Sequence, residues 1–484
     1  MIDWYLILGY VIFTVYTVMI MIVGIFLEKK TNIDKTICRK LTHIASAFIW
    51  VICHFFFGYS LHWIILNGIS TVLMGFIIFN KKITIFARDD SRKSVGLFYF
   101  CLSTFIVALI CYLVGQELYF YTAVTYYALA LGDGFAPIVA KLLKEKNKTI
   151  KEGKTLFGTL SVYLVTFAST LLFSTIFNMQ LSIPFILSVA GLTCIIEFYG
   201  AKGLDNLFIE FGVFAYLVLY HYGFVSLPLE IVLITSPLLA ILAIGSKSMT
   251  SGAGISAFIL FALVGFFGEG FLPIGFISLL FLISTVTSCI SKKLDITNTE
   301  YKKESRKAKQ IIAVGLFGII SLIIYYYTDI KLFNYLFYLS FVEQFADSMA
   351  SDIGRLTKRK NLNIITFKPI EKGISGGVSL LGTLCALGGS LLLMLVPLIF
   401  KAVSLKFYIA ISFLAFIGTI IDSVLGALFQ GLYKCKECGK LIENLLSCCA
   451  EAELVKGFRF IDNTTVNYLA SFLTCILGLV LLLL

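Results

Sequence analysis

The sequence predicts an all-α polytopic membrane protein, with about 16 transmembrane helices in two related modules of like orientation. Three observations predict this fold class. Of the 484 residues, 59% are hydrophobic and 14% are charged, and the mean hydropathy is +0.95, whereas soluble proteins carry about 25% charged residues. Apolar runs long enough to cross a bilayer, about 20 residues each, fill most of the chain. Lysine and arginine gather in alternate loops between these runs.

The apolar runs follow one another along the whole chain, and each is an expected membrane span. They lie at residues 5–27, 42–59, 61–79, 95–114, 118–140, 156–178, 181–199, 207–224, 228–244, 252–268, 271–290, 310–328, 331–350, 376–400, 404–430 and 464–484.

The basic loops predict the orientation of these spans. Positively charged loops stay on the cytoplasmic side of a membrane, and an outer N-terminus places every basic loop there. The formal charge of +11 is therefore mainly a topology signal, and no basic soluble domain is present that would bind nucleic acid. The basic loops are residues 28–41, 80–94, 141–154, 291–309, 355–372 and 434–459.

Polar clusters recur in the same order in both halves of the chain, each at the cytoplasmic end of a span. A basic pair comes first, and an aspartate then ends a span. A lysine-rich loop leads to a glycine-rich span start, so that Asp133 and Gly158 correspond to Asp347 and Gly376. This order predicts two modules in a parallel repeat, at residues 1–290 and 310–484, joined by a basic cytoplasmic linker at 291–309.

Asp133 is the first candidate site residue, because an ionisable side chain in a membrane span is costly and usually functional. Gly132 and Gly134 flank it and leave room for a ligand to approach the backbone. A lysine-rich loop follows directly. Carboxylate, small residues and lysines together favour a Mg²⁺-phosphate site. The alternative is an ordinary helix-end residue among wet headgroups.

The sequence G-K-T at residues 153–155 is not a nucleotide-binding P-loop, because Lys148 stands where that motif needs a glycine. A loop that enters a helix still offers free N–H groups to a phosphate. Lys154, Thr155 and Gly158 are placed for that role.

Four ordered motifs carry a resemblance in the first half: R-K-L-T-H, G-D-G-F-A-P-I-V-A-K, K-T-L-F-G-T and E-F-Y-G-A-K-G-L-D-N. Residues 30–225 resemble the dolichol kinase and phytol kinase family of polyprenol kinases. That family phosphorylates a long isoprenoid alcohol, typically with CTP. The resemblance implies a site in which Asp133 and Glu197 are catalytic. The other implied residues are Arg39, Lys40 and Lys154 for phosphate, and Asp133, Asp205 and Asn206 for metal.

The second half is similar to a different family. The motifs are R-K-A-K-Q-I-I-A-V-G, F-A-D-S-M-A-S-D-I-G, I-I-T-F-K-P-I-E-K-G-I-S-G-G-V-S-L-L-G-T, I-D-S-V-L-G-A-L-F-Q-G and I-D-N-T-T-V-N-Y-L-A-S-F. Residues 300–484 resemble the integral membrane family that includes the plant phytyl-phosphate kinase. Val314 replaces an expected asparagine, and Glu371 and Lys372 replace two expected prolines. The implied site residues are Asp347, Asp352, Asp422, Asn463 and Asn467 for metal, and Arg306, Lys307, Lys368, Gly376 and Gly377 for phosphate.

The two aspartates at residues 347 and 352 point apart on an unbroken helix, because they are five positions apart. They share a face only if the helix breaks near residues 349–351. We therefore expect Asp347 to be a metal ligand, and Asp352 to be a second ligand, a loop cap or an ordinary surface residue. Asp422 should approach from across the bundle as a further catalytic carboxylate.

Four cysteines gather in the last basic loop, at Cys435, Cys438, Cys448 and Cys449. A C-x-x-C step followed by a cysteine pair is a candidate structural Zn²⁺ site. Adjacent cysteines are awkward as two ligands and no histidine lies near, so free thiols are the alternative.

The two resemblances together predict a bifunctional phosphotransferase. The first module would convert an isoprenoid alcohol of the phytol, farnesol or geranylgeraniol type to its monophosphate, and the second would make the diphosphate. The predicted cofactors are Mg²⁺ and a cytosolic nucleoside triphosphate, CTP or ATP. The rivals are a CTP-dependent lipid cytidylyltransferase and a lipid-phosphate transporter. Isoprenoid length and oligomeric state stay open.

Overall fold

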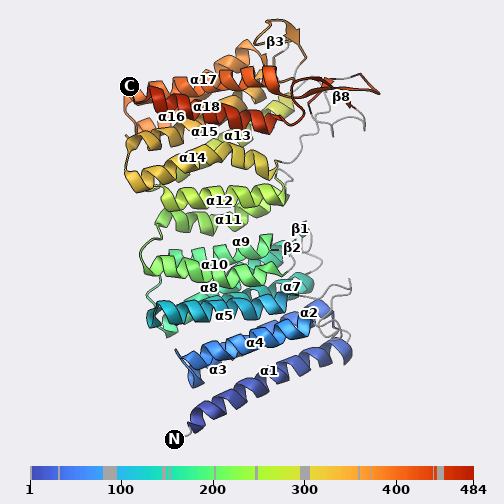
Figure 1. Cartoon of the computed structure of the whole chain (residues 1–484), viewed down its shortest axis with the longest axis vertical. Coiled ribbons are helices and arrows are strands. Elements are labelled where there is room, and N and C mark those ends of the chain that lie inside the picture. Colours follow the sequence, from blue (N-terminus) through green and yellow to red (C-terminus); the bar gives the residue numbers. More distant parts are fainter. Residues whose placement is uncertain are drawn as a thin grey trace. The chain divides into compact units, whose positions relative to one another are not determined.

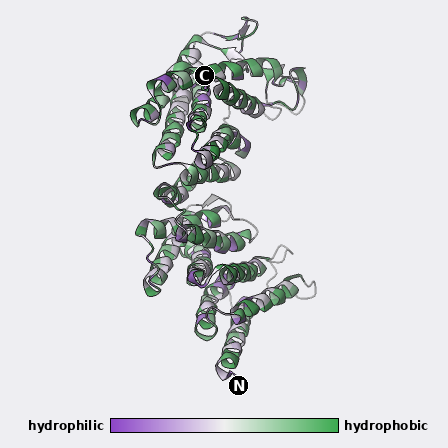
Figure 2. Ribbon diagram, turned by 60° about the vertical axis from the view of Figure 1, so that its left-hand side comes forward, coloured by the Kyte–Doolittle hydropathy of each residue, from purple (hydrophilic) through white to green (hydrophobic). Residues whose placement is uncertain are grey.

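A computed structural model describes most of the chain. The described residues are 3–30, 33–79, 95–143, 149–151, 154–200, 203–245, 249–294, 306–357, 360–371, 373–439, 441–443 and 452–483. Among them are 13 helices long and apolar enough to cross a membrane, together with the shorter apolar helices Ile183–Tyr199 and Ser251–Phe267. The all-α polytopic class is confirmed, and hydrophobic residues predominate along the helices (Figure 2).

The chain divides into two compact units, Met1–Ser251 and Gly252–Leu484. The division lies earlier in the sequence than the boundary at residue 290 expected for the modules. The helices that account for the difference are α12 (Ser251–Phe267) and α13 (Leu272–Leu294). Helix α13 packs on two helices of the second unit, α15 and α16.

The first unit is a bundle of helices with one short hairpin (Figure 1). Its elements are α1 (Trp4–Lys30), α2 (Lys35–Ala45), α3 (Ala47–Phe56), α4 (Leu61–Phe79), α5 (Gly96–Val114), η1 (Gln116–Leu118), α6 (Tyr121–Tyr127), η2 (Ala128–Asp133), α7 (Gly134–Leu142), β1 (Thr149–Lys151), β2 (Lys154–Thr155), α8 (Leu156–Ile176), α9 (Ile183–Tyr199), α10 (Leu204–His221) and α11 (Leu227–Gly245).

The helix that carries Asp133 changes its winding at that residue. Residues Ala128–Asp133 form a π-helical segment, a rare arrangement that often occurs at functional sites. Pro137 follows within α7 and has no N–H to donate to the carbonyl one turn earlier. The backbone around Asp133 is therefore irregular at the level where its side chain is buried.

The second unit is a helical bundle with two small antiparallel sheets, ordered β4-β3-β5 and β7-β6-β8. Its further elements are α14 (Ala308–Thr328), α15 (Lys331–Gly354), β3 (Asn361–Asn363), β4 (Pro369–Ile370), β5 (Gly377–Val378), α16 (Leu380–Ile399), α17 (Leu405–Phe429), β6 (Leu432–Cys435), β7 (Leu441–Ile442), β8 (Ala452–Lys456) and α18 (Asn463–Leu481). Helix α15 is central, because α13, α14, α16, α17 and α18 all pack on it.

One local arrangement occurs in both units. Thr155 caps α8 by accepting from the Gly158 N–H at 3.3 Å, and Ser379 caps α16 by accepting from the Gly382 N–H at 3.1 Å. A Cβ on Gly158 would lie 3.1 Å from the Ala136 carbonyl oxygen, and one on Gly382 would lie 2.9 Å from that of Ala350. The packing therefore pairs Gly158 with Gly382 and not with Gly376, because strands β3–β5 lengthen the second connection.

Candidate functional site

The main feature of the first unit is a cavity of about 1450 Å³ whose two ends differ in polarity. The residues of the polar end come from α2, η2, β2, α8, α9 and α10, and those of the apolar end come from α1 and α4. The polar end contains Arg39, Lys40, His43, Asp133, Lys154, Thr155, Gly158, Thr159, Glu197, Asp205 and Asn206. The apolar end contains Phe13, Ile20, Met21, Leu66, Ile69, Leu73, Met74 and Ile77, interspersed with Thr14, Thr17, Asn67 and Ser70 of the same helices.

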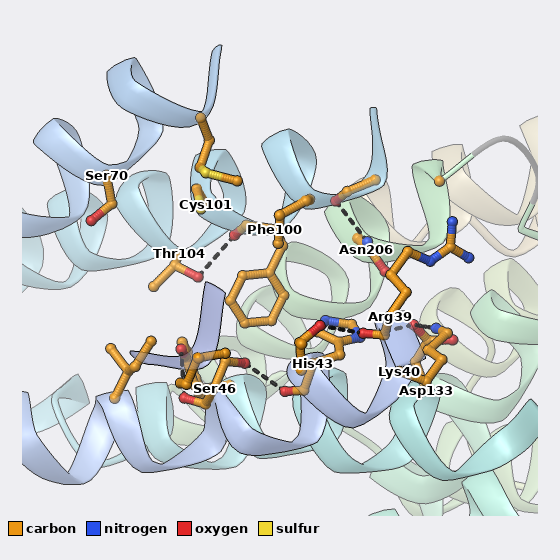
Figure 3. Close-up of a pocket in the computed structure, with 18 of the residues that line it drawn as sticks. Arg39, Lys40, His43, Ser46, Ser70, Phe100, Cys101, Thr104, Asp133 and Asn206 are labelled. Atoms are coloured by element: carbon orange, nitrogen blue, oxygen red, sulfur yellow. Dashed lines mark hydrogen bonds and ion pairs between the residues drawn. The ribbon is translucent and has the colours of Figure 1, made fainter. Parts of the chain in front are cut away.

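Asp133 is buried at the polar end, with 3% of its surface exposed. Its carboxylate forms an ion pair with Lys40 and lies 3.6 Å from His43 Nδ1. Figure 3 shows these groups together with Arg39, while Thr104 and Ser70 lie farther along the cavity. The Phe100 ring meets His43 edge-on, with the ring centroids 4.7 Å apart. Lys40, the second residue of the basic pair of α2, is thus directed at the aspartate predicted as the site.

Glu197 is the second buried carboxylate of this cavity, also 3% exposed. Its Oε1 forms an ion pair with Lys154 at the start of α8. Burial works against the charge on Lys154, but Glu197 and Asp133 outweigh it and raise the pKa of Lys154. Glu197 Oε2 and His43 Nε2 make no hydrogen bond to any described residue. Both residues line the cavity, and each of these two atoms has unused hydrogen-bonding capacity.

The remaining predicted residues of the first module fall into two groups. Arg39, Asp205, Thr155 and Gly158 line the same cavity, as does Asn206, whose Nδ2 donates to the Gly96 carbonyl at 2.7 Å. The expectation that Gly132 and Gly134 leave room for a ligand is wrong. A Cβ on Gly132 would lie 2.7 Å from Thr166 Oγ1, and one on Gly134 would lie 2.6 Å from Ile44 Cγ1. These glycines allow close helix packing and do not line the cavity.

The buried Lys154–Glu197 pair gives a stability prediction. Lys154→Met should lower the free energy of unfolding by about 3 kcal/mol, because it leaves an uncompensated buried carboxylate. The double variant Lys154→Met/Glu197→Gln should recover most of that loss. Thermal unfolding of the purified protein in detergent measures both.

The matched control for this prediction is Lys141→Met, which removes an exposed pair with Asp34 whose Nζ–Oδ2 distance is 3.6 Å. It should cost under about 1 kcal/mol. Equal losses in the single and double variants would contradict the proposed charge compensation.

In the second unit, acidic and amide side chains of three helices converge. The charges of Asp347 on α15 and Asp422 on α17 interact, and Glu343 also acts on Asp422. Gly418 permits this approach, because a Cβ there would lie 2.5 Å from Glu343 Cγ. On α18, the Asn467 amide nitrogen donates to Asp422 Oδ2 at 3.3 Å when the amide is oriented to satisfy both of its polar atoms. The expected approach of Asp422 from across the bundle is thus observed.

Asp352 lies on a different face of α15 from Asp347, although its charge still acts on Asp347. Helix α15 continues unbroken to Gly354, so the two aspartates point about 140° apart, at 100° per residue. The Asp352 carbonyl accepts a hydrogen bond from Ser291 Oγ, and Arg306 interacts electrostatically with Asp352. Lys307 is exposed, and its N–H donates to Gln310 Oε1 at 2.8 Å at the start of α14.

Four further residues of the second module lie outside this acidic cluster. Lys368 is exposed in the turn between β3 and β4, and Asn463 is the exposed first residue of α18. Gly376 has a φ of +80°, and a Cβ there would lie 2.4 Å from Ala427 Cβ. A Cβ on Gly377 would lie 2.9 Å from Ile370 Cδ1. Both glycines therefore serve close packing of the loop.

The cysteine cluster is only partly described. Cys435 is buried on β6 and Cys438 is exposed, while Cys448 and Cys449 lie outside the described residues. Within the described part of the chain, no three histidine, cysteine or acidic side chains form a metal-binding group. The Zn²⁺ site stays a prediction.

Sequence reasoning missed His43 and Glu343 as site residues. His43 follows Lys40 by three positions, so that the two share a helix face, and this spacing could have indicated it. Glu343 precedes Asp347 by four positions in the same way. The sequence shows that α15 is rich in acidic residues, but it does not show that these side chains are buried.

This chain is similar in sequence to a family of integral membrane proteins and to two further proteins. The family model described as "Integral membrane protein DUF92" matches residues 234–475. Protein PGR of Arabidopsis thaliana is 32% identical over 142 residues, 27% of this chain and 48% of that protein. An uncharacterized membrane protein of Synechocystis sp. is 32% identical over 91 residues, 19% of this chain and 35% of that protein. The chain thus matches less than half the length of either relative. No solved structure matches it.

Proposed function

We propose, on the premise that this chain belongs to the integral membrane protein family DUF92, that it is a bifunctional phosphotransferase for isoprenoid lipids. The first unit makes an isoprenyl monophosphate from the alcohol, and the second adds another phosphate. CTP is the proposed donor. The family match covers residues 234–475. The sequence resemblance to polyprenol kinases supports the proposed role of the first unit.

The observation that carries the proposal is the cavity of the first unit. It joins a polar end, with two buried carboxylates and three basic side chains, to an apolar end between α1, α4 and α5. An isoprenoid alcohol has the same division, a polar hydroxyl at one end of a hydrocarbon chain.

The residues of this cavity suit phosphoryl transfer, which needs mainly positioning and charge neutralisation. The alcohol oxygen attacks the γ-phosphorus of the donor, the bond from that phosphorus to the bridging oxygen breaks, and the nucleoside diphosphate leaves. Asp133 or Glu197 accepts the alcohol proton. Lys40, Lys154 and Arg39 neutralise the phosphate oxygens, and the two lysines are already held nearby by their ion pairs.

Mg²⁺ fits this set of donors. Glu197 Oε2 has no partner among the described residues, and Mg²⁺ commonly takes only one or two protein carboxylates together with substrate phosphate oxygens. Asp133 and Glu197 would hold the ion, which would neutralise phosphate charge.

The acidic cluster of the second unit suits the second transfer. Asp347, Asp422 and Asn467 together supply oxygen and amide groups at one place on α15, α17 and α18. The nucleophile there is a phosphate oxygen that is already charged near neutral pH, so no strong base is required. We place both sites on the cytoplasmic side, because the basic loops adjoin them and the nucleotide is cytosolic.

The test is incubation of the purified full chain with geranylgeraniol, Mg²⁺ and CTP or ATP, in detergent and without a membrane gradient. We expect geranylgeranyl monophosphate and then diphosphate by mass spectrometry, with release of the nucleoside diphosphate. Release of pyrophosphate instead would identify a cytidylyltransferase. Unmodified lipid with every nucleotide would contradict the phosphotransferase and leave transport as the better explanation.

A further inference from the structure

The cavity of the first unit ends at a contact between α1 and α4 that the proposed chemistry does not use. Tyr10 is the first residue of α1 that lines the cavity, and Leu66 is the first of α4. The Tyr10 hydroxyl lies 2.8 Å from His62 Nδ1, one helical turn before Leu66, so a hydrogen bond joins the two helices here. Among the described residues, none of 3–9 and none of 50–65 lines the cavity. The apolar end therefore stops at Tyr10.

Packed neighbours hold the Tyr10 ring on its other side. The Phe57 ring centroid lies 5.1 Å from that of Tyr10, and the His62 ring meets Tyr10 edge-on at 5.9 Å. Neither Phe57 nor His62 lines the cavity, so the Tyr10 ring stands between them and the cavity. The backbone of α1 is held as well, because a Cβ on Gly9 would lie 2.6 Å from Phe56 Cβ. Tyr10 thus forms a packed end wall.

The side walls of the apolar end have a definite length. The residues that line the cavity extend from Tyr10 to Met21 on α1 and from Leu66 to Ile77 on α4. Both stretches advance about 16 Å along the helix axis, at 1.5 Å per residue. Beyond Met21, a Cβ on Gly24 would lie 2.5 Å from Thr42 Cγ2 of α2. The later residues of α1 therefore lie toward the polar end, which α2 helps to form.

A hydrocarbon tail fits the polarity of these walls. The polar side chains among the apolar ones mostly use their hydrogens within their own helix. Thr14 Oγ1 and Ser70 Oγ each donate to the carbonyl oxygen four residues earlier at 2.8 Å, and Asn67 Nδ2 does so at 2.9 Å. Thr17 Oγ1 is the exception, without a hydrogen-bond partner among the described residues. The walls therefore present few free donors to a ligand.

We infer that Tyr10 sets the longest isoprenoid that the first unit accepts, because its ring ends the part of the cavity that takes the tail. The inference rests on the proposed function of that unit. With the hydroxyl at the polar end, the tail extends between α1 and α4 toward Tyr10. A fully extended chain advances about 1.2 Å per main-chain bond, so one isoprenoid repeat covers about 4.5 Å. The walls therefore hold about four repeats, and a further repeat would meet the Tyr10 ring.

The test is a length series of isoprenoid alcohols, from farnesol through geranylgeraniol to hexaprenol. Each alcohol is offered to the full chain at equal mole fraction in mixed micelles, with CTP and Mg²⁺. We expect kcat/KM to fall by about 10-fold or more at the first repeat beyond the limit, because a closed hydrophobic pocket discriminates against added groups by about that much. Equal use of hexaprenol and geranylgeraniol would overturn the inference, because the tail would then leave sideways into the bilayer.

Two variants should move this limit in opposite directions. Tyr10→Ala removes the ring and should raise kcat/KM for the first excluded alcohol by about 10-fold relative to that for geranylgeraniol. Thr14→Phe places a ring one helical turn, about 5.4 Å, nearer the polar end and should shorten the accepted tail by about one repeat. Thr14 is exposed and lines the cavity, so the added ring has room. Partial unfolding lowers the rates for all lengths alike, so the ratios between lengths are compared. A limit that stays at the wild-type length in both variants would overturn the inference.

Tyr5→Ala is the matched control, because Tyr5 makes the same kinds of contact on α1 without lining the cavity. Its hydroxyl donates to the Phe55 carbonyl at 2.8 Å, and its ring centroid lies 5.0 Å from that of Phe56. The control should keep the wild-type limit. A shift as large as that of Tyr10→Ala would overturn the assignment of the limit to Tyr10.

Binding of the alcohols without nucleotide separates this inference from the proposed function. The measurement is the rise in melting temperature of the purified chain with each alcohol, because a ligand that binds only the folded state stabilises it. A length limit in binding that Tyr10→Ala moves, without any phosphorylated product, would support the end wall at Tyr10 and contradict the phosphotransferase. Monophosphate formed equally from every length would do the reverse.

Discussion

Asp133→Asn is expected to lower the formation of isoprenyl monophosphate from the alcohol by about 10²–10⁴-fold, the usual contribution of a general base. Asparagine has the size of aspartate but carries no charge and cannot take a proton from the alcohol. It also leaves Lys40 without the carboxylate that holds it in the cavity. The measurement is the initial rate of geranylgeranyl monophosphate formation, followed by mass spectrometry.

Asp34→Asn is the matched control for this variant. Asp34 is exposed and caps α2 by accepting from the Thr36 N–H at 2.7 Å, and asparagine caps helices about as well. The control should retain the wild-type rate. The Asp133 variant should also still convert added monophosphate to diphosphate, because that step belongs to the second unit. An undiminished first step in Asp133→Asn would show that the site assignment is wrong.

The second large effect is expected from Asp347→Asn and Asp422→Asn, which should each make geranylgeranyl monophosphate accumulate. The rate of diphosphate formation should fall by about 10²–10³-fold, because preorganised charges in a site of this kind contribute that much. The first step should continue. Product ratios after feeding the alcohol and CTP measure both steps in one reaction.

Stability separates this effect from unfolding. The charge of Asp347 acts unfavourably on Glu343 and Asp422, and that of Glu343 acts on Asp422, so neutralising one of them should leave the melting temperature equal or higher. Asp329→Asn is the control, because Asp329 is an exposed cap with a φ of +53° that asparagine also adopts readily. Continued diphosphate formation in both cluster variants would exclude the acidic cluster as the second site.

Several features of the candidate site could be predicted from local sequence. Asp133, Lys154 and Glu197 each occur within a motif, and all three line the same cavity. Thr155 stands at the start of an apolar run in the sequence, and it caps α8. Such features depend on neighbours within one or two helical turns, and the sequence displays those neighbours directly.

Other features were predicted wrongly from the sequence, because they depend on which helix packs against the residue concerned. Gly132 and Gly134 stand beside a buried carboxylate in the sequence, yet they contact Thr166 and Ile44 from other helices. Asp347 and Asp352 would share a helix face only if α15 broke, and α15 does not break. A glycine looks alike in the sequence whether it admits a ligand or a neighbouring helix.

By itself, the sequence determined that this chain is a polytopic helical membrane protein, where its apolar helices lie, and which carboxylates interrupt them. The length and polarity of each segment suffice for that, because a bilayer selects on both. Only the tertiary structure decided that Lys40 meets Asp133, that Gln430 donates to Glu443, and that the units divide near residue 251. Those outcomes depend on the rotation and packing of helices that are distant in the chain, which no local pattern encodes.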